Sequence, residues 1–200
     1  MEGHRTLHDV ERRIGQTFRA TLIAVSLVSG LGAVARAQPC DDPISFQFTG
    51  LRPLAEVDLR RPPPVNLSEL LRQDEQMANS PFRHHRVGAT LKTDLAPQTV
   101  GTWENLPIGG RVWRLRIQTP GALWVMLGMG TFRLQRPAQC WVYNEQRVVV
   151  ACFTADSVRP HGQRWTFAVP GDTAVVEIHW PPELAGQMPN VHLGAFVHGY

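Results

Sequence analysis

The segment from Arg111 to Phe132 constrains the fold more than any other part of the chain. In its first half, apolar side chains at Trp113, Leu115 and Ile117 alternate with polar side chains. A period of two places the apolar set on one face of a β-strand and the polar set on the other. Proline and glycine at 119–122 then provide the backbone angles of a turn. This half of the segment predicts a strand with one buried face.

Short strands and turns continue to the end of the chain. The run 123–127 is apolar at every position, which predicts a strand that is covered on both faces. From Val87 onward, eight or nine short runs of this kind are separated by turns, and the chain holds 16 prolines and 17 glycines. This pattern predicts an all-β fold, an antiparallel β-sandwich or jelly-roll-like structure, with one short helix before it.

We divide the chain into four parts on this basis. They are a signal peptide at 1–37, an extended proline-rich leader at 38–64, a short helix and connector at 65–84, and the β-sandwich domain at 85–200. In the leader, Ile44, Phe46 and Phe48 alternate with other residues, which predicts an edge strand.

The helix is expected to begin at Asn66, with Glu69 reaching back as in a capping box, and to end at Ser80-Pro81. A lone helix of this length is marginal in water, so we expect it to pack on the sheets.

The first 37 residues have the three regions of a secretory signal peptide. Arginines precede an apolar run at 20–34, and the small-residue pattern Ala35-Arg36-Ala37 follows it. The alternative is a membrane anchor, but the run is shorter than the roughly 20 residues that span a bilayer. We therefore expect cleavage between Ala37 and Gln38 and a secreted or periplasmic protein with no membrane attachment.

The remaining chain carries almost no net charge. Five of the 20 Lys and Arg residues and three of the 17 Asp and Glu residues precede Gln38, which leaves 15 against 14 and a net charge of +1. A near-neutral domain has no general attraction for nucleic acid, so no nucleic-acid partner is expected.

Three cysteines remain after cleavage, and exported cysteines normally form disulfides. Cys140 and Cys152 lie on the two arms of a predicted hairpin with its tip near Asn144–Val148. A register that places them opposite each other predicts a Cys140–Cys152 disulfide and a free Cys40. Two free buried thiols are the alternative. The spacing of the three cysteines does not match a zinc site.

No pattern of catalytic residues is present in the sequence. The serines at 45, 68, 80 and 157 lie outside any G-x-S-x-G or G-D-S-G-G motif, and no H-E-x-x-H motif occurs. His179 and Glu177 share a strand face and form the one acid–base or metal-ligand candidate, although a solvated strand face is the simpler interpretation. We predict no catalytic residue, no metal, no cofactor and no enzymatic activity.

Tryptophans are the one suggestive set of side chains. Their places inside strands favour core packing, and the alternative is an exposed aromatic platform for a sugar or a peptide. They stand at positions 103, 113, 124, 141, 165 and 180.

Several motifs occur in the order in which they appear in one protease family. They are LSELLRQDEQMANSPFR, GTWENLPIGGRVWRLRIQTPGAL, FTADSVRPHGQRWTFAVPGDTAVVEIHWPP and the final VHGY. Together they resemble, from about Val57 to Tyr200, the non-catalytic N-terminal region of secreted bacterial trypsin-like serine proteases of the lysyl endopeptidase type. That region is similar to a propeptide, and the catalytic domain of the family follows it. No catalytic residue is carried over to this chain.

The resemblance implies a protein-binding role. The expected partner is a trypsin-like serine protease or another exported protein, which the domain folds or inhibits in trans, or else the chain is the remnant of a truncated precursor. The leader and the tail 197–200 are the expected contact segments. A secreted carbohydrate-binding or surface-interaction β-sandwich is the alternative.

The signal peptide generates the first testable prediction. The exported protein is expected to begin at Gln38, because the small residues before it fit signal peptidase. Intact-mass measurement of protein from the periplasm or culture fluid checks this. An exported form that retains residues 1–37 would contradict the assignment.

Overall fold

The structure is a computed structural model that describes residues 40–78 and 86–200. The predicted signal peptide, its cleavage site at Ala37 and Gln38, and the predicted end of the helix at Ser80-Pro81 lie outside the described residues.

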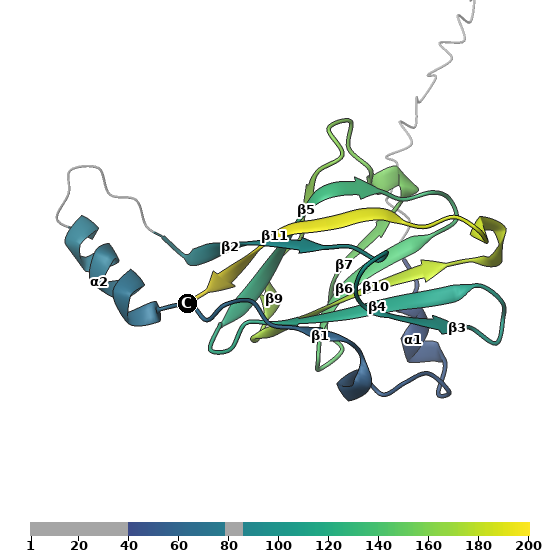
Figure 1. Cartoon of the computed structure of the whole chain (residues 1–200), viewed down its shortest axis with the longest axis horizontal. Helices are drawn as coiled ribbons and strands as arrows, with labels where there is room; N and C mark the ends of the chain where they lie inside the picture. Colours follow the sequence, from purple (N-terminus) through teal and green to yellow (C-terminus); the bar gives the residue numbers. More distant parts are fainter. Residues whose placement is uncertain (1–39, 79–85) are drawn as a thin grey trace, which may run out of the picture. The chain divides into compact units, whose positions relative to one another are not determined.

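Two β-sheets confirm the predicted all-β fold (Figure 1). Sheet A has the order β1 (Leu59–Arg60), β4 (Arg111–Gln118), β10 (Thr173–Trp180), β6 (Gln139–Asn144) and β7 (Val149–Thr154), and β3 (Thr102–Asn105) also pairs with β4. Sheet B has the order β2 (Gly88–Leu95), β11 (Asn190–Gly199), β5 (Trp124–Arg133) and β8 (Arg164–Trp165), and β9 (Val169–Pro170) also pairs with β5. Every pairing is antiparallel except that of β1 with β4.

The described residues contain 11 strands, more than the eight or nine expected. One reason is that the predicted strand at 165–169 is divided into β8 and β9. Another is that the leader contributes β1. The described helical segments are α1 (Ile44–Gln47), α2 (Leu67–Ala78) and the 3-10 turns η2 (Leu54–Glu56), η3 (Ala155–Ser157) and η4 (Pro182–Leu184).

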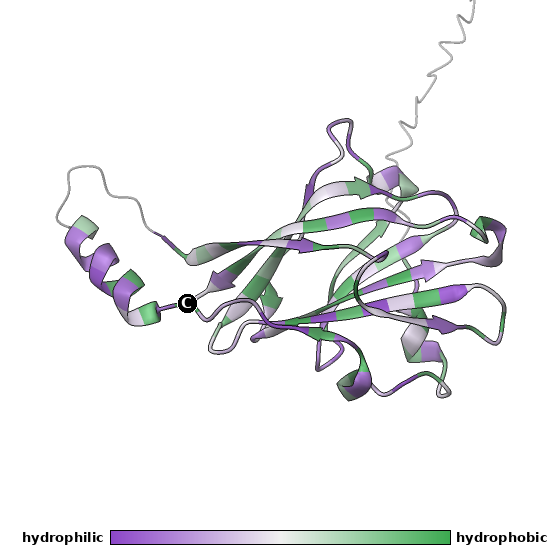
Figure 2. Cartoon of the chain, viewed as in Figure 1, coloured by the Kyte–Doolittle hydropathy of each residue, from purple (hydrophilic) through white to green (hydrophobic). Residues whose placement is uncertain are grey.

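The main core lies between the two sheets. Trp113, Leu115 and Ile117 of β4 face it and are at most 1% exposed, as their alternation predicted. Figure 2 shows the same alternation of hydropathy along several strands. Val125 and Leu127 of β5 meet them from sheet B and are fully buried. Burial of apolar area at about 25 cal/mol per Å² makes this interface the main source of stability.

The prediction that 123–127 is covered on both faces is wrong. Leu123 is 69% exposed, and Trp124 and Met126 are half-buried on the outer face of sheet B. The strand that is covered on both faces is β10, in which seven of eight residues are buried.

The leader forms that second cover of β10, on the outer face of sheet A. The predicted edge strand at 44–48 is wrong, because Ile44–Gln47 forms the short helix α1. Ile44 packs with Leu106 and Val112, and the ring of Phe46 meets the ring of Tyr143 edge-to-face at 4.9 Å between centroids. The leader is therefore a packed layer and not a free arm.

Helix α2 begins as predicted, because the side chain of Asn66 accepts a hydrogen bond from the backbone N–H of Glu69 (3.1 Å). Glu69 does not complete the capping box and instead pairs with Arg72. The expectation that the helix packs on the sheets is not met: none of its residues from Leu67 to Met77 is buried. Asp74 of this helix accepts a hydrogen bond from the hydroxyl of Tyr200 (2.7 Å).

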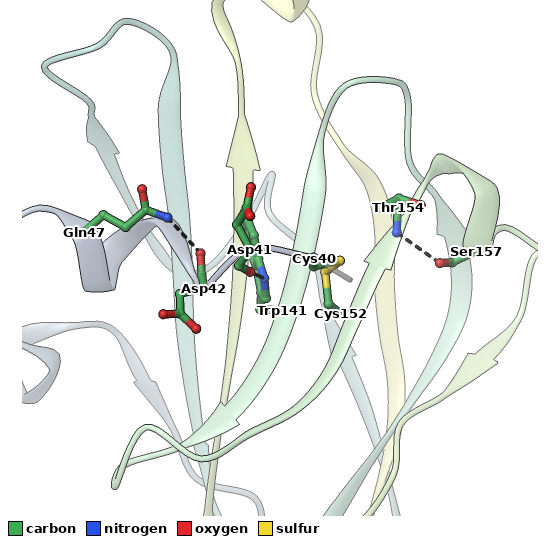
Figure 3. Close-up of a disulfide and its surroundings, with 8 residues drawn as sticks. All are labelled: Cys40, Asp41, Asp42, Gln47, Trp141, Cys152, Thr154 and Ser157. Carbon is green, nitrogen blue, oxygen red and sulfur yellow. Dashed lines mark hydrogen bonds between the residues drawn. A yellow bond between two sulfur atoms is a disulfide. The ribbon is translucent and has the colours of Figure 1, made fainter. Parts of the chain in front are cut away.

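The disulfide differs from the prediction: Cys40 pairs with Cys152, and Cys140 is free and buried (Figure 3). The predicted hairpin register holds near the tip, where Tyr143 lies opposite Val149. A β-bulge then shifts the register by one residue, so that Trp141 lies opposite Cys152. A one-residue shift turns a side chain to the other face of the sheet. Cys140 thus points into the core, and Cys152 points outward to the leader.

We predict one free thiol per chain, at Cys140, which reacts only after unfolding because burial makes it inaccessible. Thiol counting and peptide mapping without reductant check this. Replacing both Cys40 and Cys152 with Ser is expected to destabilise the fold by about 2–4 kcal/mol, since the bond closes a long loop. Cys140→Ala, which keeps the bond, is the control, and a free thiol at Cys40 would contradict the pairing.

Candidate binding site

Glu177 and His179 occupy the outer face of β10, but this face is not solvated. Glu177 has no solvent exposure, and His179 is half-buried with its Nε2 atom buried and without a partner. Burial lowers the pKa of His179. The solvated strand face expected here is not found, because the leader covers it, and nothing in the sequence indicates this cover.

The leader supplies the hydrogen bonds that Glu177 needs. Ser45 donates its backbone N–H to Oε1 (2.8 Å) and its hydroxyl to Oε2 (2.5 Å). The hydroxyl of Tyr143 also donates to Oε2 (2.7 Å). Burial raises the pKa of Glu177, while the hydrogen bonds from Ser45 and Tyr143 and the charge of Arg114 act in the opposite direction. This arrangement fixes the leader to β10.

The expected contact segments are packed or paired over much of their length. The start of the leader is tied down by the disulfide and by a hydrogen bond from the Trp141 indole to the carbonyl of Asp41 (2.9 Å) (Figure 3). Further along the leader, Leu59–Arg60 forms the parallel pair of β1 with β4. The tail 197–199 lies in β11 between β2 and β5. The described residues of both segments therefore take part in the fold.

Sheet B carries exposed aromatic side chains along the edge that β8 and β9 form. Trp165 is 51% exposed and lies opposite Gly128 of β5. Phe167 is 74% exposed and lies in the segment that joins β8 to β9, both of which pair with β5. Half-buried Trp124 and Met126 lie on the neighbouring part of β5. We call these four residues, Trp124, Met126, Trp165 and Phe167, the aromatic face.

A shallow groove of about 230 Å³ adjoins Trp165. Its lining is made mainly of small residues and is completed by Gln163 and Met129; the small ones are Gly128, Gly130, Gly194 and Ala195. Gly128 is required here, because a Cβ atom at this position would lie 2.7 Å from the Trp165 ring. The indole thus lies directly on the backbone of β5 and presents a flat aromatic surface at the groove.

The six tryptophans differ in burial: some pack in the core, as one interpretation of the sequence predicted, and one is exposed. Core packing holds for Trp113, Trp141 and Trp180, which are at most 1% exposed, while Trp103 and Trp124 are half-buried. Only Trp165 among the six is exposed, all six being in the described parts of the chain. No sequence signal distinguished Trp165, because Gly128, which leaves room for its ring, is brought opposite it only by the pairing of β8 with β5.

The described serines have structural partners. Ser45 bonds Glu177, Ser68 bonds Asn66 at the start of α2, and the hydroxyl of Ser157 accepts a hydrogen bond from the backbone N–H of Thr154. Within residues 40–78 and 86–200, no serine hydroxyl bonds a histidine, and no group of three or more His, Cys, Asp or Glu side chains could hold a metal ion. In the same residues, no helix has the length and apolar character to cross a membrane.

A comparison of the chain with protein-family models finds no match.

The pKa of Glu177 generates a prediction about stability. A carboxyl group whose pKa is raised in the folded state stabilises the fold at low pH, and this contribution is lost as the pH rises through the folded-state pKa. Relative to Glu177→Gln, which does not titrate, the wild type should gain stability as the pH falls from 8 toward 5. Urea unfolding of both proteins across this range measures the difference.

The control is Glu75→Gln, at an exposed position on α2. Its stability relative to the wild type should not show the same trend. A wild type that loses stability relative to Glu177→Gln as the pH falls would mean that the hydrogen bonds of Ser45 and Tyr143 outweigh burial, contrary to the assigned direction.

Proposed function

We propose that the chain is an exported, non-catalytic binding module of the prodomain type, which binds a trypsin-like serine protease of the lysyl endopeptidase type through the aromatic face. A disulfide between Cys40 and Cys152 fits an oxidising compartment, where such bonds persist. The motifs from Val57 to Tyr200 support the choice of partner, because they resemble the propeptide region of that family.

The exposure of Trp165 and Phe167 is the observation that carries the proposal. Both side chains stand on the same sheet edge at 51% and 74% exposure, and Leu123 adds an apolar residue at 69% exposure at the start of β5. Aromatic residues on rigid strands are frequent anchors of protein interfaces, since they bury much area and lose little conformational entropy. A face of this kind suits a partner that covers it during folding or inhibition.

The opposite side of the sandwich is less suited to the same role. There the leader already covers Trp141, Tyr143 and Val175, which form a small core of their own with Phe46 and Leu54. A partner that bound this face would first have to displace a disulfide-linked layer. A specific interface buries roughly 1,200–2,000 Å² in total, so we expect contacts of the partner to extend from the aromatic face over β5 and β8.

Refolding and binding measurements test the function. We expect the wild-type domain to bind the catalytic domain of such a protease at micromolar concentration or below, and to change its refolding yield or its activity. Trp165→Ala and Phe167→Ala should each weaken binding by about tenfold or more, as central aromatic anchors do. Ile108→Ala is the matched control, because Ile108 is 60% exposed in the turn between β3 and β4.

A carbohydrate-binding function is the second candidate, and the groove beside Trp165 favours it. A flat indole over a floor of Gly128, Gly130 and Gly194 can stack on a sugar ring, and Gln163 can provide hydrogen bonds. If no protease binds at micromolar concentration and refolding is unchanged, while a glycan array gives a hit that Trp165→Ala removes, this function replaces the first.

A further inference from the structure

A second cavity lies on the other side of the molecule, between the leader and the outer face of sheet A. Its volume is about 330 Å³, at the lower end of the range of small-molecule sites. The leader provides most of its wall, and sheet A with the β6–β7 turn provides the rest. The lining residues are Ser45, Phe46, Phe48, Thr49, Leu51, Arg52, Pro53, Leu54, Arg114, Tyr143 and Arg147. We call it the leader cavity.

The wall of the leader cavity is apolar and cationic. Five apolar side chains of the leader line it together with three arginines, Arg52, Arg114 and Arg147, and no carboxylate is among the lining residues, all of which the structure describes. Two carboxylates form hydrogen bonds with lining residues. Glu104 accepts hydrogen bonds from the backbone of Arg52 (2.7 Å) and from Arg114 (2.5 Å), and Glu177 bonds Ser45 and Tyr143. A net positive charge remains at the cavity.

Arg114 retains hydrogen-bonding capacity that nothing in the described residues uses. Its side chain is only 5% exposed, and its Nη2 atom donates to Glu104 and to the carbonyl of Arg52. Its Nε atom is buried without a partner. A buried donor without a partner is costly, so this guanidinium is incompletely satisfied in the wall of the cavity.

Arg147 lines the cavity and has an unusual backbone conformation. It lies in the β6–β7 turn with a φ of 64°, in the left-handed region that non-glycine residues rarely adopt. Its guanidinium lies 5.1 Å from the centre of the Phe46 ring. Among the ion pairs of the described residues, neither Arg147 nor Arg52 has a carboxylate partner.

We propose that the leader cavity binds a small organic carboxylate with an aromatic or aliphatic body. The body would pack against Phe46, Phe48 and Leu54, and the carboxylate would face Arg52 and Arg147 at the exposed side of the cavity. Arginine is well suited to this task, because its planar donors match a carboxylate in pairs. This site is independent of the aromatic face and of any protease.

Such a carboxylate has two sources, a free acid or the C-terminal residue of a peptide. Binding of N-acetyl-L-phenylalanine and of the peptide Ala-Ala-Phe is compared with binding of their C-terminal amides, which have the same shape without the charge. The probes are titrated into the isotope-labelled full exported chain and followed by NMR. We expect both acids, or one of them, to bind about tenfold more tightly than the matching amide.

Two variants locate the site. Arg147→Gly removes one guanidinium and accepts the positive φ without strain, so the fold is kept. Arg52→Ala removes the other. Each should weaken binding of the acid by about fivefold or more, since each removes one charge-assisted contact. Arg159→Gly, at an exposed arginine of another loop, should leave it unchanged.

Two further results complete the test: which backbone amides shift on binding, and which of the two acids binds more tightly. Shifts at the backbone amides of Phe46, Phe48 and Arg147 are expected. A tighter complex with the peptide identifies a chain terminus as the ligand, and a tighter complex with the free acid identifies a small molecule; both support the site. Equal binding of acid and amide, no binding by either acid at millimolar concentration, or no effect of Arg147→Gly would overturn it.

Discussion

The carboxyl group of Glu177 has no access to solvent, although it lies on the outer face of a sheet. An unpaired carboxyl group in such a place would be strongly destabilising. Three donated hydrogen bonds satisfy it, and two of them come from Ser45 of the leader. These donors come from a residue 132 positions away in the sequence, so the hydrogen bonding of Glu177 on β10, the central strand of sheet A, depends on the leader.

This constraint gives the two outer faces of the sandwich different roles. On sheet A, the disulfide of Cys40 with Cys152, the ring contact of Phe46 with Tyr143 and the pairing of β1 with β4 all hold the leader over Glu177. On sheet B, no comparable layer lies over the aromatic face among the described residues, and Trp165 and Phe167 remain exposed. The proposed partner binds where the fold has left apolar side chains uncovered, and the proposed carboxylate binds within the wall of the covering layer.

Local patterns predicted the strands of the sandwich well. The alternation of Trp113, Leu115 and Ile117 was sufficient to place the core face of β4, because a strand with one buried face has a period of two. The cap at Asn66 was also visible, since capping depends on neighbours within three residues. In both cases the determining contacts are close in sequence or repeat along it.

Contacts between distant segments were not predictable in the same way. The bulge near Val150 turns Cys152 away from Cys140. No side-chain pattern in the hairpin indicates that one strand holds an extra residue. The alternation of Ile44, Phe46 and Phe48 suggested a strand. In the structure a short helix forms instead, from which Ile44 packs on Val112 and Phe46 on Tyr143, both far along the chain. The buried role of Glu177 and the exposure of Trp165 both follow from which face the leader covers, and that depends on tertiary packing.

Hydrogen exchange of the protein, alone and with the proposed protease partner, tests the difference between the two faces most directly. In the free protein, the amide of Ser45 should be protected, because it donates to a fully buried carboxyl group. On binding, protection should increase in β5 and in the segment 164–170, and the leader should not change. A leader that exchanges as fast as an unfolded chain, or that alone gains protection on binding, would contradict the assignment of sheet A as the closed face and sheet B as the binding face.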